Sequence, residues 1–324
     1  MTDINTDLLD SEKKQILTSK IKEKARELGF DACGIARVDT VDADHQNRFN
    51  RWTEKGMHYK MDYMKNHFDK RMNPELLVEG AKSIICLAMN YHQENFQPPD
   101  AFYKVSSYAA GKDYHLVIKE KLYELLQFIK KQTEINNARV FTDSAPVMER
   151  YWAQKAGLGW IGKNSCLIIP RKGSFYFLAE IILDTELIND DPFDKNYCGT
   201  CHRCMDACPT HAITEPGVID GRKCISCLTI ETKDPINKDI RQKTQRYIFG
   251  CDICQQVCPH NKRFARKTNQ PAFQPTHAIA SWQKQDWEKM NAQDYKHFFI
   301  KPKTAFHRIK FDKLKDNMDA AKKI

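Results

Sequence analysis

The chain has 324 residues, of which 41% are hydrophobic and 29% charged, and this is the composition of a soluble protein with about two domains. Its polar, acidic start resembles no secretory signal, and its longest apolar stretches, 83–89 and 175–183, are too short or interrupted to span a bilayer, so we expect a cytoplasmic protein without membrane contact. The formal net charge of +9 lies wholly in residues 260–324, where 15 Lys and Arg stand against 6 Asp and Glu.

Hydrophobic spacing predicts alternating helices and strands in the first 187 residues. Helices are expected at 12–28, 117–129 and 146–156, and strands at 32–38, 82–89, 139–142 and 175–183. Gly29 and Gly157 follow the first and third helices as C-terminal stops, and Pro146 stands where the third helix would begin. This alternation predicts an α/β or α+β domain, followed by an Asp-rich linker at 189–196.

Residues 157–162 match G-x-G-x-x-G, and Lys163 extends the run to nearly a phosphate-binding loop. Both nucleotide-binding motifs need a strand before the glycines and a helix after them, so that the phosphate meets a helix N-terminus. Here a helix precedes the glycines, and Asn164 replaces the Ser or Thr that would hold magnesium. We therefore reject nucleotide binding and expect the glycines to form a tight turn against a bulky cofactor.

Two cysteine runs give the most specific signal in the chain. Residues 198–209 read Cys-x2-Cys-x2-Cys-x3-Cys-Pro, and residues 251–259 read Cys-x2-Cys-x3-Cys-Pro. In two-cluster ferredoxins, the cysteine before proline ligates the other cluster. The spacing therefore predicts two iron–sulfur clusters, one on Cys198, Cys201, Cys204 and Cys258, and one on Cys208, Cys251, Cys254 and either Cys224 or Cys227.

The same cysteines have two other interpretations. A structural zinc site closes with four ligands and has no need of the repeated Cys-Pro pairs. Disulfides do not suit a chain without a secretory segment. Iron–sulfur clusters are therefore the preferred interpretation, and one-electron chemistry is the first functional hypothesis. Cys33, Cys86 and Cys166 stand singly in apolar surroundings and are interpreted as small core residues.

The domain before the clusters should receive their electrons. Asp113-Tyr-His115 begins like the D-x-H-x-x-G motif that supplies a histidine ligand to cobalamin, but Ile118 stands at the glycine position. We discount this motif on its own.

The basic end of the chain has two interpretations of equal weight. Lys262, Arg263, Arg266 and Lys267 follow the second cysteine run directly. They form either a solvated basic face or a contact for a polyanion such as nucleic acid. Each cluster with its four thiolates would carry a charge on the order of −2, and this negative charge must be counted in the net charge of the region.

Several motifs together resemble epoxyqueuosine reductase. The motifs are 108–115 (YAAGKDYH), 143–150 (DSAPVMER), 157–164 (GLGWIGKN) and the two cysteine runs, and the match spans about residues 15–265 in the same order. The resemblance implies an α+β fold with an N-terminal nitroreductase-like cobalamin domain, similar to that of reductive dehalogenases, a two-cluster ferredoxin-like module and a short helical C-terminal tail. The implied parts are 1–187, 188–265 and a basic segment 266–324.

The resemblance also implies the cofactors and their residues. Two 4Fe-4S clusters and cobalamin are expected; Cys224 would complete cluster two, Cys227 would be spare, and Asp143 would be the proton donor. The residues implied to line the corrinoid are Arg71, Ser106, Asp143, Leu167, Leu178, Ser226, Cys251 and Asp252.

The implied reaction converts an epoxide on a modified tRNA base to an alkene, the last step of queuosine synthesis, with two electrons and two protons consumed. The substrate would be tRNA carrying epoxyqueuosine in its anticodon loop, the enzyme a monomer, and the electron donor an unidentified partner. Asp143 is expected just before a helix, where ionisation is favoured, so burial against the corrin must raise its pKa. Taken alone, Asp143 would instead be read as a helix cap.

Two further functions stay open at this point. A plain dicluster electron carrier would not need so large a leading domain. A reductive dehalogenase would share the cofactors and act on a small organohalide, but the basic tail argues against it. Many members of the resembling family continue into a C-terminal helical repeat region, whereas this sequence ends at Ile324.

Overall fold

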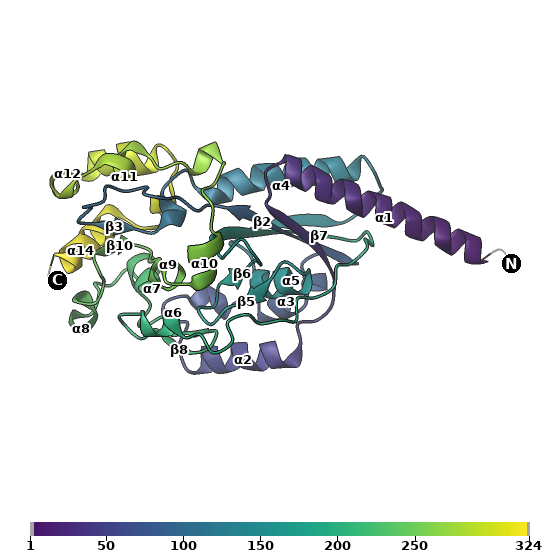
Figure 1. The fold of residues 1–324 in the computed structure, drawn as a ribbon, viewed down its shortest axis with the longest axis horizontal. Coiled ribbons are helices and arrows are strands. Elements are labelled where there is room, and N and C mark those ends of the chain that lie inside the picture. Colours follow the sequence, from purple (N-terminus) through teal and green to yellow (C-terminus); the bar gives the residue numbers. More distant parts are fainter. Residues whose placement is uncertain (1–2, 323–324) are drawn as a thin grey trace.

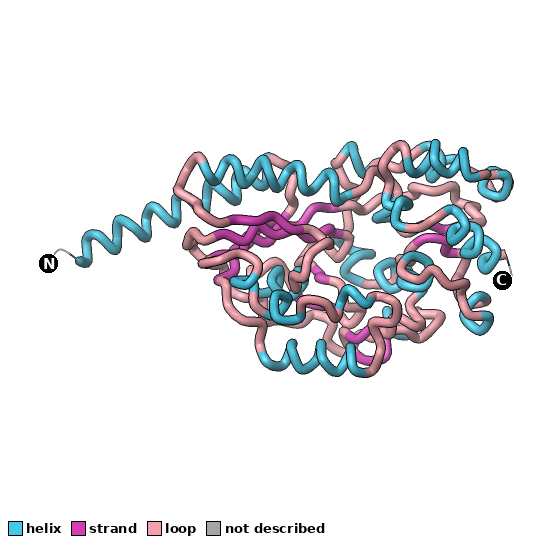
Figure 2. The backbone as a smooth tube through the Cα atoms, turned by 180° about the vertical axis from the view of Figure 1, so that it is seen from behind, coloured by secondary structure: helices cyan, strands magenta, loops and turns pink. Residues whose placement is uncertain are grey.

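A four-stranded antiparallel sheet, in the order β1-β2-β7-β4, lies at the centre of the first half of the chain. Its strands are β1 (Ala32–Arg37), β2 (Ser83–Asn90), β4 (Ala138–Phe141) and β7 (Tyr176–Leu183). The computed structural model describes residues 3–322, and Figures 1 and 2 show the sheet between two layers of helices. Every pairing is antiparallel, so the mixed helix and strand pattern resolves as α+β.

Alternate residues of the strands build two separate cores. Ile35, Ile85 and Ile181 face helices α1 (Asp3–Glu27) and α4 (Tyr114–Lys130). Ile84 and Ile182, one residue along, face the other layer, with α2 (Ala43–Glu54), α3 (Phe68–Met72) and α5 (Glu149–Lys155). Successive side chains of a strand point to opposite faces of the sheet. Because these strands are apolar at both odd and even positions, both faces of the sheet must be covered.

The four predicted strands are confirmed, and two predicted helix boundaries are wrong. Helix α1 begins at Asp3, nine residues before the predicted start. Its first turns project beyond the body of the protein, and their sequence shows no apolar periodicity that would predict a helix (Figure 1). Helix α5 begins at Glu149, because residues 143–148 form a loop in which the Ser144 amide donates to the Thr142 carbonyl at 2.6 Å. Pro146 therefore lies in that loop and does not start the helix.

Gly34 lets α5 approach the sheet. A Cβ at this position would lie 2.0 Å from the Ala156 carbonyl oxygen and 2.6 Å from Leu158 Cδ1. We expect Gly34→Ala to destabilise the protein by about 1–3 kcal/mol, because the end of α5 must move to relieve the overlap. The thermal denaturation midpoint measures this, and an unchanged midpoint would show that the Ala156 turn moves freely.

The second half of the chain is built from short elements. It is joined to the first half by a parallel pair, β3 (Lys104–Val105) with β10 (Tyr247–Phe249). The hairpin β5 (Trp160–Ile161) with β6 (Leu167–Ile168) also packs against it, through Trp160 and Ile168 on Cys258. The short elements of the second half are α6 (Arg203–Asp206), β8 (Ile213–Glu215), β9 (Val218–Ile219), α7 (Ile225–Ile230), α8 (Lys238–Arg241), α9 (Ile253–Gln256) and α10 (Pro259–Phe264). The first half also contains η1 (Asp62–Met64), η2 (Pro74–Leu76) and η3 (Ser107–Ala109).

The C-terminal segment packs into both preceding parts of the chain. Its elements are η4 (Pro271–Phe273), α11 (His277–Ser281), α12 (Lys284–Lys289), α13 (Ala292–Tyr295), η5 (Lys296–Ile300), η6 (Ala305–Arg308) and α14 (Phe311–Ala321). Phe306 stacks on Phe249 at 4.2 Å, and Asn317 donates to the carbonyls of Thr229 and Ile248, each at 2.9 Å. One apolar cluster therefore crosses the predicted boundaries.

The three-part division at 187 and 265 stays a prediction. Residues 1–2 and 323–324, at the ends of its first and third parts, lie outside the described residues. Within residues 3–322, no helix has both the length and the apolarity needed to cross a membrane.

Candidate functional site

Asp143 lies at the centre of a polar group that four parts of the chain contribute. It follows β4, with φ of 52°, a left-handed conformation that Asp tolerates better than most residues. Tyr114 Oη donates a hydrogen bond to Asp143 Oδ2. His115 Nε2 lies 3.5 Å and Arg308 Nη1 lies 3.7 Å from the same oxygen. A carboxylate with three donors around one oxygen is held in one orientation.

His115 is fixed at the start of α4 by Asp113. The Asp113 side chain caps the helix by accepting from the His115 amide, and it also bonds His115 Nδ1 at 2.8 Å. Burial lowers the pKa of His115, but bonds to Asp113 and Asp143 outweigh it and raise the pKa to about 9. His115 is therefore protonated at neutral pH, with its other ring nitrogen toward Asp143. The discounted D-x-H pattern therefore marks a histidine that lies beside Asp143.

Arg308 reaches this group from the C-terminal segment. Its Nη2 donates to both carboxylate oxygens of Glu231, at 2.9 and 3.0 Å, while its Nη1 faces Asp143. Burial alone would lower the pKa of Arg308, but the two carboxylates raise it further above its usual value. A permanent positive charge thus lies beside Asp143. Sequence reasoning missed Arg308, because nothing local links residue 308 to residue 143.

Glu149 and Glu180 lie behind Asp143. Glu149, the first residue of α5, accepts a hydrogen bond from the Asp143 amide at 2.5 Å. Burial and the nearby Asp143 raise the pKa of Glu149 to about 8. Glu180 is 0% exposed in the middle of β7, and burial followed by the charges of Glu149 and Asp143 raises its pKa well above the ordinary value. Both side chains therefore carry a proton at neutral pH.

One sequence-based interpretation of Asp143 is wrong. Asp143 does not cap α5: its side chain points to Tyr114, His115 and Arg308, and the N-cap residue is Met148. In the protein alone, burial pushes the pKa of Asp143 upward, but the bonds from His115 and Tyr114 and the charge of Arg308 outweigh burial and lower it. The expected rise of this pKa against the corrin stays a prediction. Two adjacent carboxyls do not both ionise readily, and here Asp143 takes the charge and Glu149 the proton.

The Asp143 side chain is 44% exposed, although burial is the largest influence on its pKa. Arg71 Nε and Ser107 Oγ are buried without a hydrogen-bond partner within residues 3–322. Burial lowers the pKa of Arg71, and the charge of Glu149 partly opposes that shift. Buried polar atoms without a partner suit a bound group that carries amides.

The eight predicted cluster cysteines fall into two electrostatic groups. In the first, burial raises the pKa of Cys204 and of Cys258; Cys198 raises both further, and Cys201 raises that of Cys258. Trp160 Nε1 donates to Cys198 Sγ at 3.5 Å. The fold thus brings Cys258, from the second run, to the first three cysteines of the first run.

In the second group, burial raises the pKa of Cys251 and of Cys254, and Cys224 raises both further. Cys208 also raises the pKa of Cys251, and the Ala212 amide donates to Cys208 Sγ at 3.3 Å. Cys227 is 6% exposed and interacts with Cys224.

A single ion would need its ligands closer together than either group places them. Within residues 3–322, no three His, Cys, Asp or Glu side chains are placed to share one metal ion. The buried thiols meet as two sets of four at longer range. Cys166, interpreted as a core residue, is half-buried between the sets: burial raises its pKa to about 11, and Cys258 and Cys204 add to that rise.

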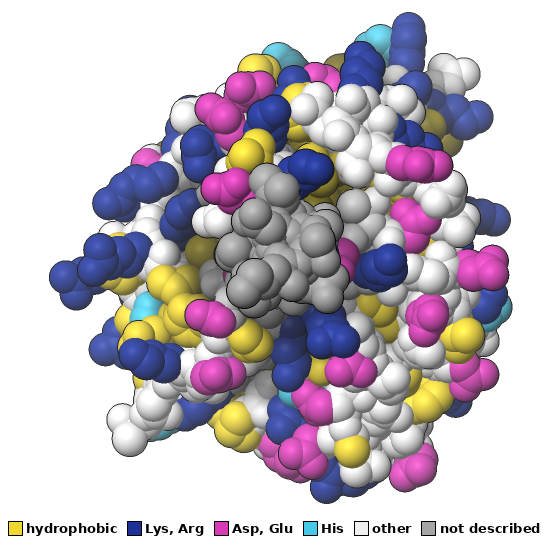
Figure 3. Space-filling model, turned by 90° about the vertical axis from the view of Figure 1, so that its right-hand side faces the viewer, with side chains coloured by type: hydrophobic (Ala, Val, Ile, Leu, Met, Phe, Trp, Pro, Cys, Tyr) yellow, Lys and Arg dark blue, Asp and Glu magenta, His cyan; other side chains and the backbone are white. Residues whose placement is uncertain are grey.

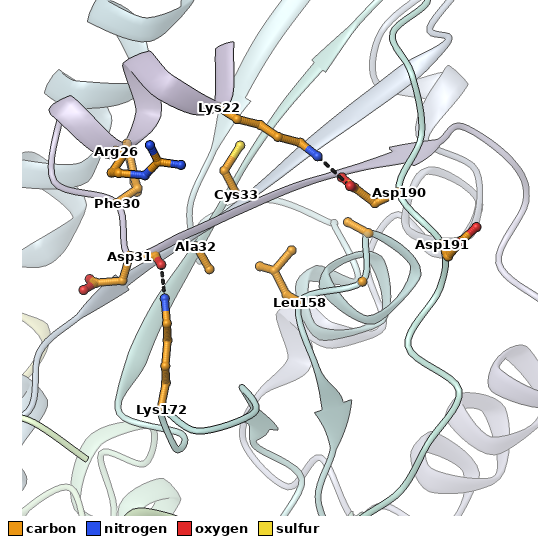
Figure 4. Close-up of a pocket in the computed structure, with 12 residues that line it drawn as sticks. Lys22, Arg26, Phe30, Asp31, Ala32, Cys33, Leu158, Lys172, Asp190 and Asp191 are labelled. Carbon is orange, nitrogen blue, oxygen red and sulfur yellow. Dashed lines mark hydrogen bonds and ion pairs between the residues drawn. The ribbon is translucent and has the colours of Figure 1, made fainter. Parts of the chain in front are cut away.

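A hollow of about 550 Å³ opens beside β1 (Figure 4). Lys22 Nζ pairs with Asp190 Oδ1 at 2.5 Å there, and Lys172 donates to the Asp31 carbonyl. Burial raises the pKa of Cys33 in its wall to about 12, so that thiol stays protonated. None of the predicted site residues lines this hollow.

Comparison with known proteins identifies the family of this chain. The family model described as epoxyqueuosine reductase QueG, DUF1730, matches residues 71–144, and a 4Fe-4S double cluster binding domain matches residues 197–261. An epoxyqueuosine reductase of Leadbetterella byssophila is 49% identical over 308 residues, which cover 95% of this chain and 99% of that protein. The chain belongs to the epoxyqueuosine reductase family. Another member, from Cyclobacterium marinum, is 48% identical over 94% of this chain and 96% of its own length.

Solved structures of epoxyqueuosine reductase share this fold. A selenomethionine-labelled one has a TM-score of 0.83 at 30% identity, and one with an epoxyqueuosine-modified tRNA-Tyr stem loop has a TM-score of 0.81 at 30% identity; each comparison covers 94% of this chain and 80% of the other. The family match confirms the double-cluster module, and the predicted recognition of the family is confirmed with it.

Five of the residues predicted to contact the corrinoid of an epoxyqueuosine reductase lie around one region. Ser106 Oγ donates to Asp252, whose other oxygen accepts from the Ser107 amide at 2.7 Å, and Asp252 follows Cys251 directly. The β3–β10 pairing sets this register, because the Ser106 amide donates to the Phe249 carbonyl at 2.8 Å. On the far side, the Leu178 carbonyl accepts from Thr142, beside Asp143.

Three predicted contacts are linked less directly. Ser226 lies in the first turn of α7, next to Cys224 of the second cysteine set. Leu167 is 5% exposed in β6. Arg71 lies on the Glu149 side, with Nη2 donating to the Tyr63 carbonyl at 3.3 Å. No bond joins these three to the Ser106–Asp252 pair among the described residues, and their role stays a prediction.

Proposed function

We propose that this chain is an oxidoreductase that reduces the epoxide of epoxyqueuosine in tRNA to the alkene of queuosine. The observation that carries this proposal is the group of proton-bearing side chains around Asp143, in a chain that is 49% identical to an epoxyqueuosine reductase over nearly its whole length. Breaking a carbon–oxygen bond requires an acid at the leaving oxygen, and this group supplies one.

Two 4Fe-4S clusters would be held by the two cysteine sets. Cluster one takes Cys198, Cys201, Cys204 and Cys258, and cluster two takes Cys208, Cys224, Cys251 and Cys254. The matched double-cluster module and the mutual effects of the thiols on their pKa values support this division. Iron would replace the proton on each thiol, so cluster binding would release protons.

Cobalamin would lie between Asp143 and the second cysteine set. Arg71, Ser106, Leu167, Leu178, Ser226, Cys251 and Asp252 would line it, with Asp143 at its edge. Its reduced cobalt supplies a strong nucleophile fed by single electrons from the clusters. Ser106 and Asp252 hold the β3–β10 junction together at this place, which fixes the position of the second cysteine set.

The residues around Asp143 divide the work of proton transfer. Asp143 is ionised in this state, so it must first take a proton and then deliver it to the epoxide oxygen. His115 is protonated and faces Asp143, and Asp113 holds its ring. Tyr114 and Arg308 orient the carboxylate. Because Arg308 favours the charged form, arrival of the substrate oxygen must compete with that ion pair.

The substrate would be tRNA with epoxyqueuosine in the anticodon loop, a single-stranded base that can be turned into a pocket. A structure of an epoxyqueuosine reductase with a modified tRNA stem loop supports this assignment. The end of the protein from which α1 projects intersperses Lys and Arg with Asp and Glu (Figure 3). The net positive charge lies instead in residues 260–324, which also supply Arg308 to the site. We expect a cytoplasmic monomer that takes its electrons from a separate donor.

Charge reversal at Lys262, Arg263 and Arg266, which are all exposed, should weaken tRNA binding. If each contacts a phosphate, the slope of log affinity against log salt should fall by about 0.7 per residue lost. Binding titrations at several salt concentrations measure this. Reversal of the exposed Lys20, Lys130 and Lys131 removes the same charge elsewhere and serves as the control. Equal affinity at low salt for the tail variant and the parent would rule out this contact.

The decisive experiment is anaerobic incubation of the protein with cobalamin, a chemical reductant and tRNA containing epoxyqueuosine, followed by nucleoside mass analysis. Formation of queuosine is expected. A dicluster electron carrier would give none and would show no corrinoid absorbance after reconstitution. A reductive dehalogenase would instead release halide from an aryl halide without RNA. Either of these results would replace the proposed function.

A further inference from the structure

The reduction of one epoxide consumes two protons. Two carbon–oxygen bonds break, the carbon–carbon π bond forms, and the oxygen leaves as water, while two electrons arrive one at a time from a one-electron donor through the clusters. A single carboxyl at Asp143 delivers one proton and must be reloaded before it can deliver another. The side chains in contact with Asp143 therefore have to include proton stores.

Glu180 is an unusual residue in the central sheet. It is 0% exposed, its neighbours across the sheet are Cys86 of β2 and Phe141 of β4, and neither of its oxygens has a hydrogen-bond partner within the described residues 3–322. Glu180 lies two residues before Ile182 on the same strand, so both side chains point to the same face of the sheet, the one covered by α5. A charged carboxylate without a partner is too costly in such a place, so Glu180 is a neutral acid.

Glu149 connects this buried acid to the reaction site. It starts the helix that covers the Glu180 face, and its Oε1 accepts from the Asp143 amide at 2.5 Å. Glu180 and Asp143 each interact with it electrostatically. The other charged groups that face Glu149 are Arg150 on its own helix, His115 on α4 and Arg71 on α3. Glu149 thus contacts the Asp143 loop directly and interacts electrostatically with the buried Glu180 carboxyl.

We propose that Glu149, backed by Glu180, stores one of the two protons of each turnover and passes it to Asp143, while His115 holds the other. This inference rests on the proposed function, because it assigns its protons to that reaction. Burial keeps Glu149 protonated at neutral pH. After Asp143 has given its proton to the epoxide oxygen, transfer of the Glu149 proton reloads Asp143 and leaves the negative charge on Glu149. Glu180 is inaccessible to solvent, and its neutral carboxyl group fills the space behind Glu149.

Infrared spectroscopy of protonated carboxyl groups tests the stores without turnover. Two buried carboxyl C=O bands that shift in D2O are expected at pH 7. The Glu149 band should disappear as pH rises through about 8 and should be absent in Glu149→Gln. The Glu180 band should persist across that range and be absent in Glu180→Gln, or in Glu180→Met if the amide variant does not fold. Spectra without either band, or bands unchanged in the variants, would overturn the proposal.

Turnover tests the connection to the reaction. Glutamine at residue 149 retains an oxygen that accepts from the Asp143 amide, so the loop stays in place while the proton is lost. We expect Glu149→Gln to lower turnover about a hundredfold and to abolish the fall in rate near pH 8. The exposed Glu75→Gln should match the parent in rate and pH profile. A Glu149→Gln rate within twofold of the parent, with an unchanged pH profile, would refute the store.

Different results would contradict the proposed function and the proposed proton stores. If the carboxyl bands behave as described but the parent protein does not convert epoxyqueuosine in tRNA, the substrate assignment is wrong and the buried proton stores remain. If the parent converts the substrate and the bands are missing, the function holds and the stores are wrong.

Discussion

Asp143→Asn should reduce turnover by about 10²–10⁴-fold while both clusters and cobalamin stay bound. Asparagine matches the shape of aspartate, tolerates the left-handed φ of 52° at this position, and can still accept from Tyr114. What it cannot do is carry a proton to the leaving oxygen. Turnover is measured by nucleoside mass analysis, and cofactor binding is measured by iron content and corrinoid absorbance.

The comparison with alanine separates chemistry from backbone strain. Asp143→Ala loses the same proton and in addition places a residue less tolerant of positive φ at the turn, so it should be less stable than Asp143→Asn. The exposed Asp39→Asn provides the matched control and should keep the parent rate. A near-normal rate in Asp143→Asn would remove Asp143 from the mechanism.

Substitution of the cysteine before each proline should damage the cluster of the other run. Cys258→Ala should lose about half of the iron and leave the same cluster signal as Cys201→Ala, although Cys258 lies in the run of Cys251 and Cys254. Cys208→Ala should resemble Cys254→Ala. The physical reason is that Cys258 lies with Cys198, Cys201 and Cys204. Iron analysis and electron paramagnetic resonance of the reduced proteins distinguish the two patterns.

Cys227→Ala is the control for these variants. Cys227 is nearly as buried as Cys258, with 6% and 8% of each residue exposed, so the control carries a similar packing loss. It should retain both clusters, whereas Cys224→Ala should lose cluster two. Loss of iron in Cys227→Ala with full iron in Cys224→Ala would exchange the roles of these two cysteines.

The elements that were predictable from sequence are those that local chemistry determines. The strands 82–89 and 175–183 are long apolar runs, and the Cys-Pro spacing specifies its module whatever surrounds it. The start of α5 was not predictable from Pro146, because a long-range constraint decides it: the Asp143 amide bonds to Glu149 and the Asp143 side chain to α4. Both bonds hold residues 143–148 out of the helix.

The site was predictable in its centre but not in its surroundings. Asp143 was identified by resemblance alone, and nothing in the sequence indicated that His115 and Arg308 are its neighbours and lower its pKa in the protein alone. A local signal existed for His115 in the D-x-H pattern, and for Glu180 as the one charged residue in an apolar strand. No local signal existed for Arg308, which meets Asp143 only through the tertiary fold.

The position of Arg308 beside Asp143 affects when the site can be completed during synthesis of the chain. Residue 308 is held in place by η6 and by α14, whose Asn317 is anchored to Thr229 and Ile248. A nascent chain that has released its first 290 residues from the ribosome already contains every cysteine and Asp143, yet it lacks the cation beside that carboxylate. We therefore expect removal of the residues from 301 onward to lower turnover, although every predicted cluster cysteine and Asp143 would remain in the chain.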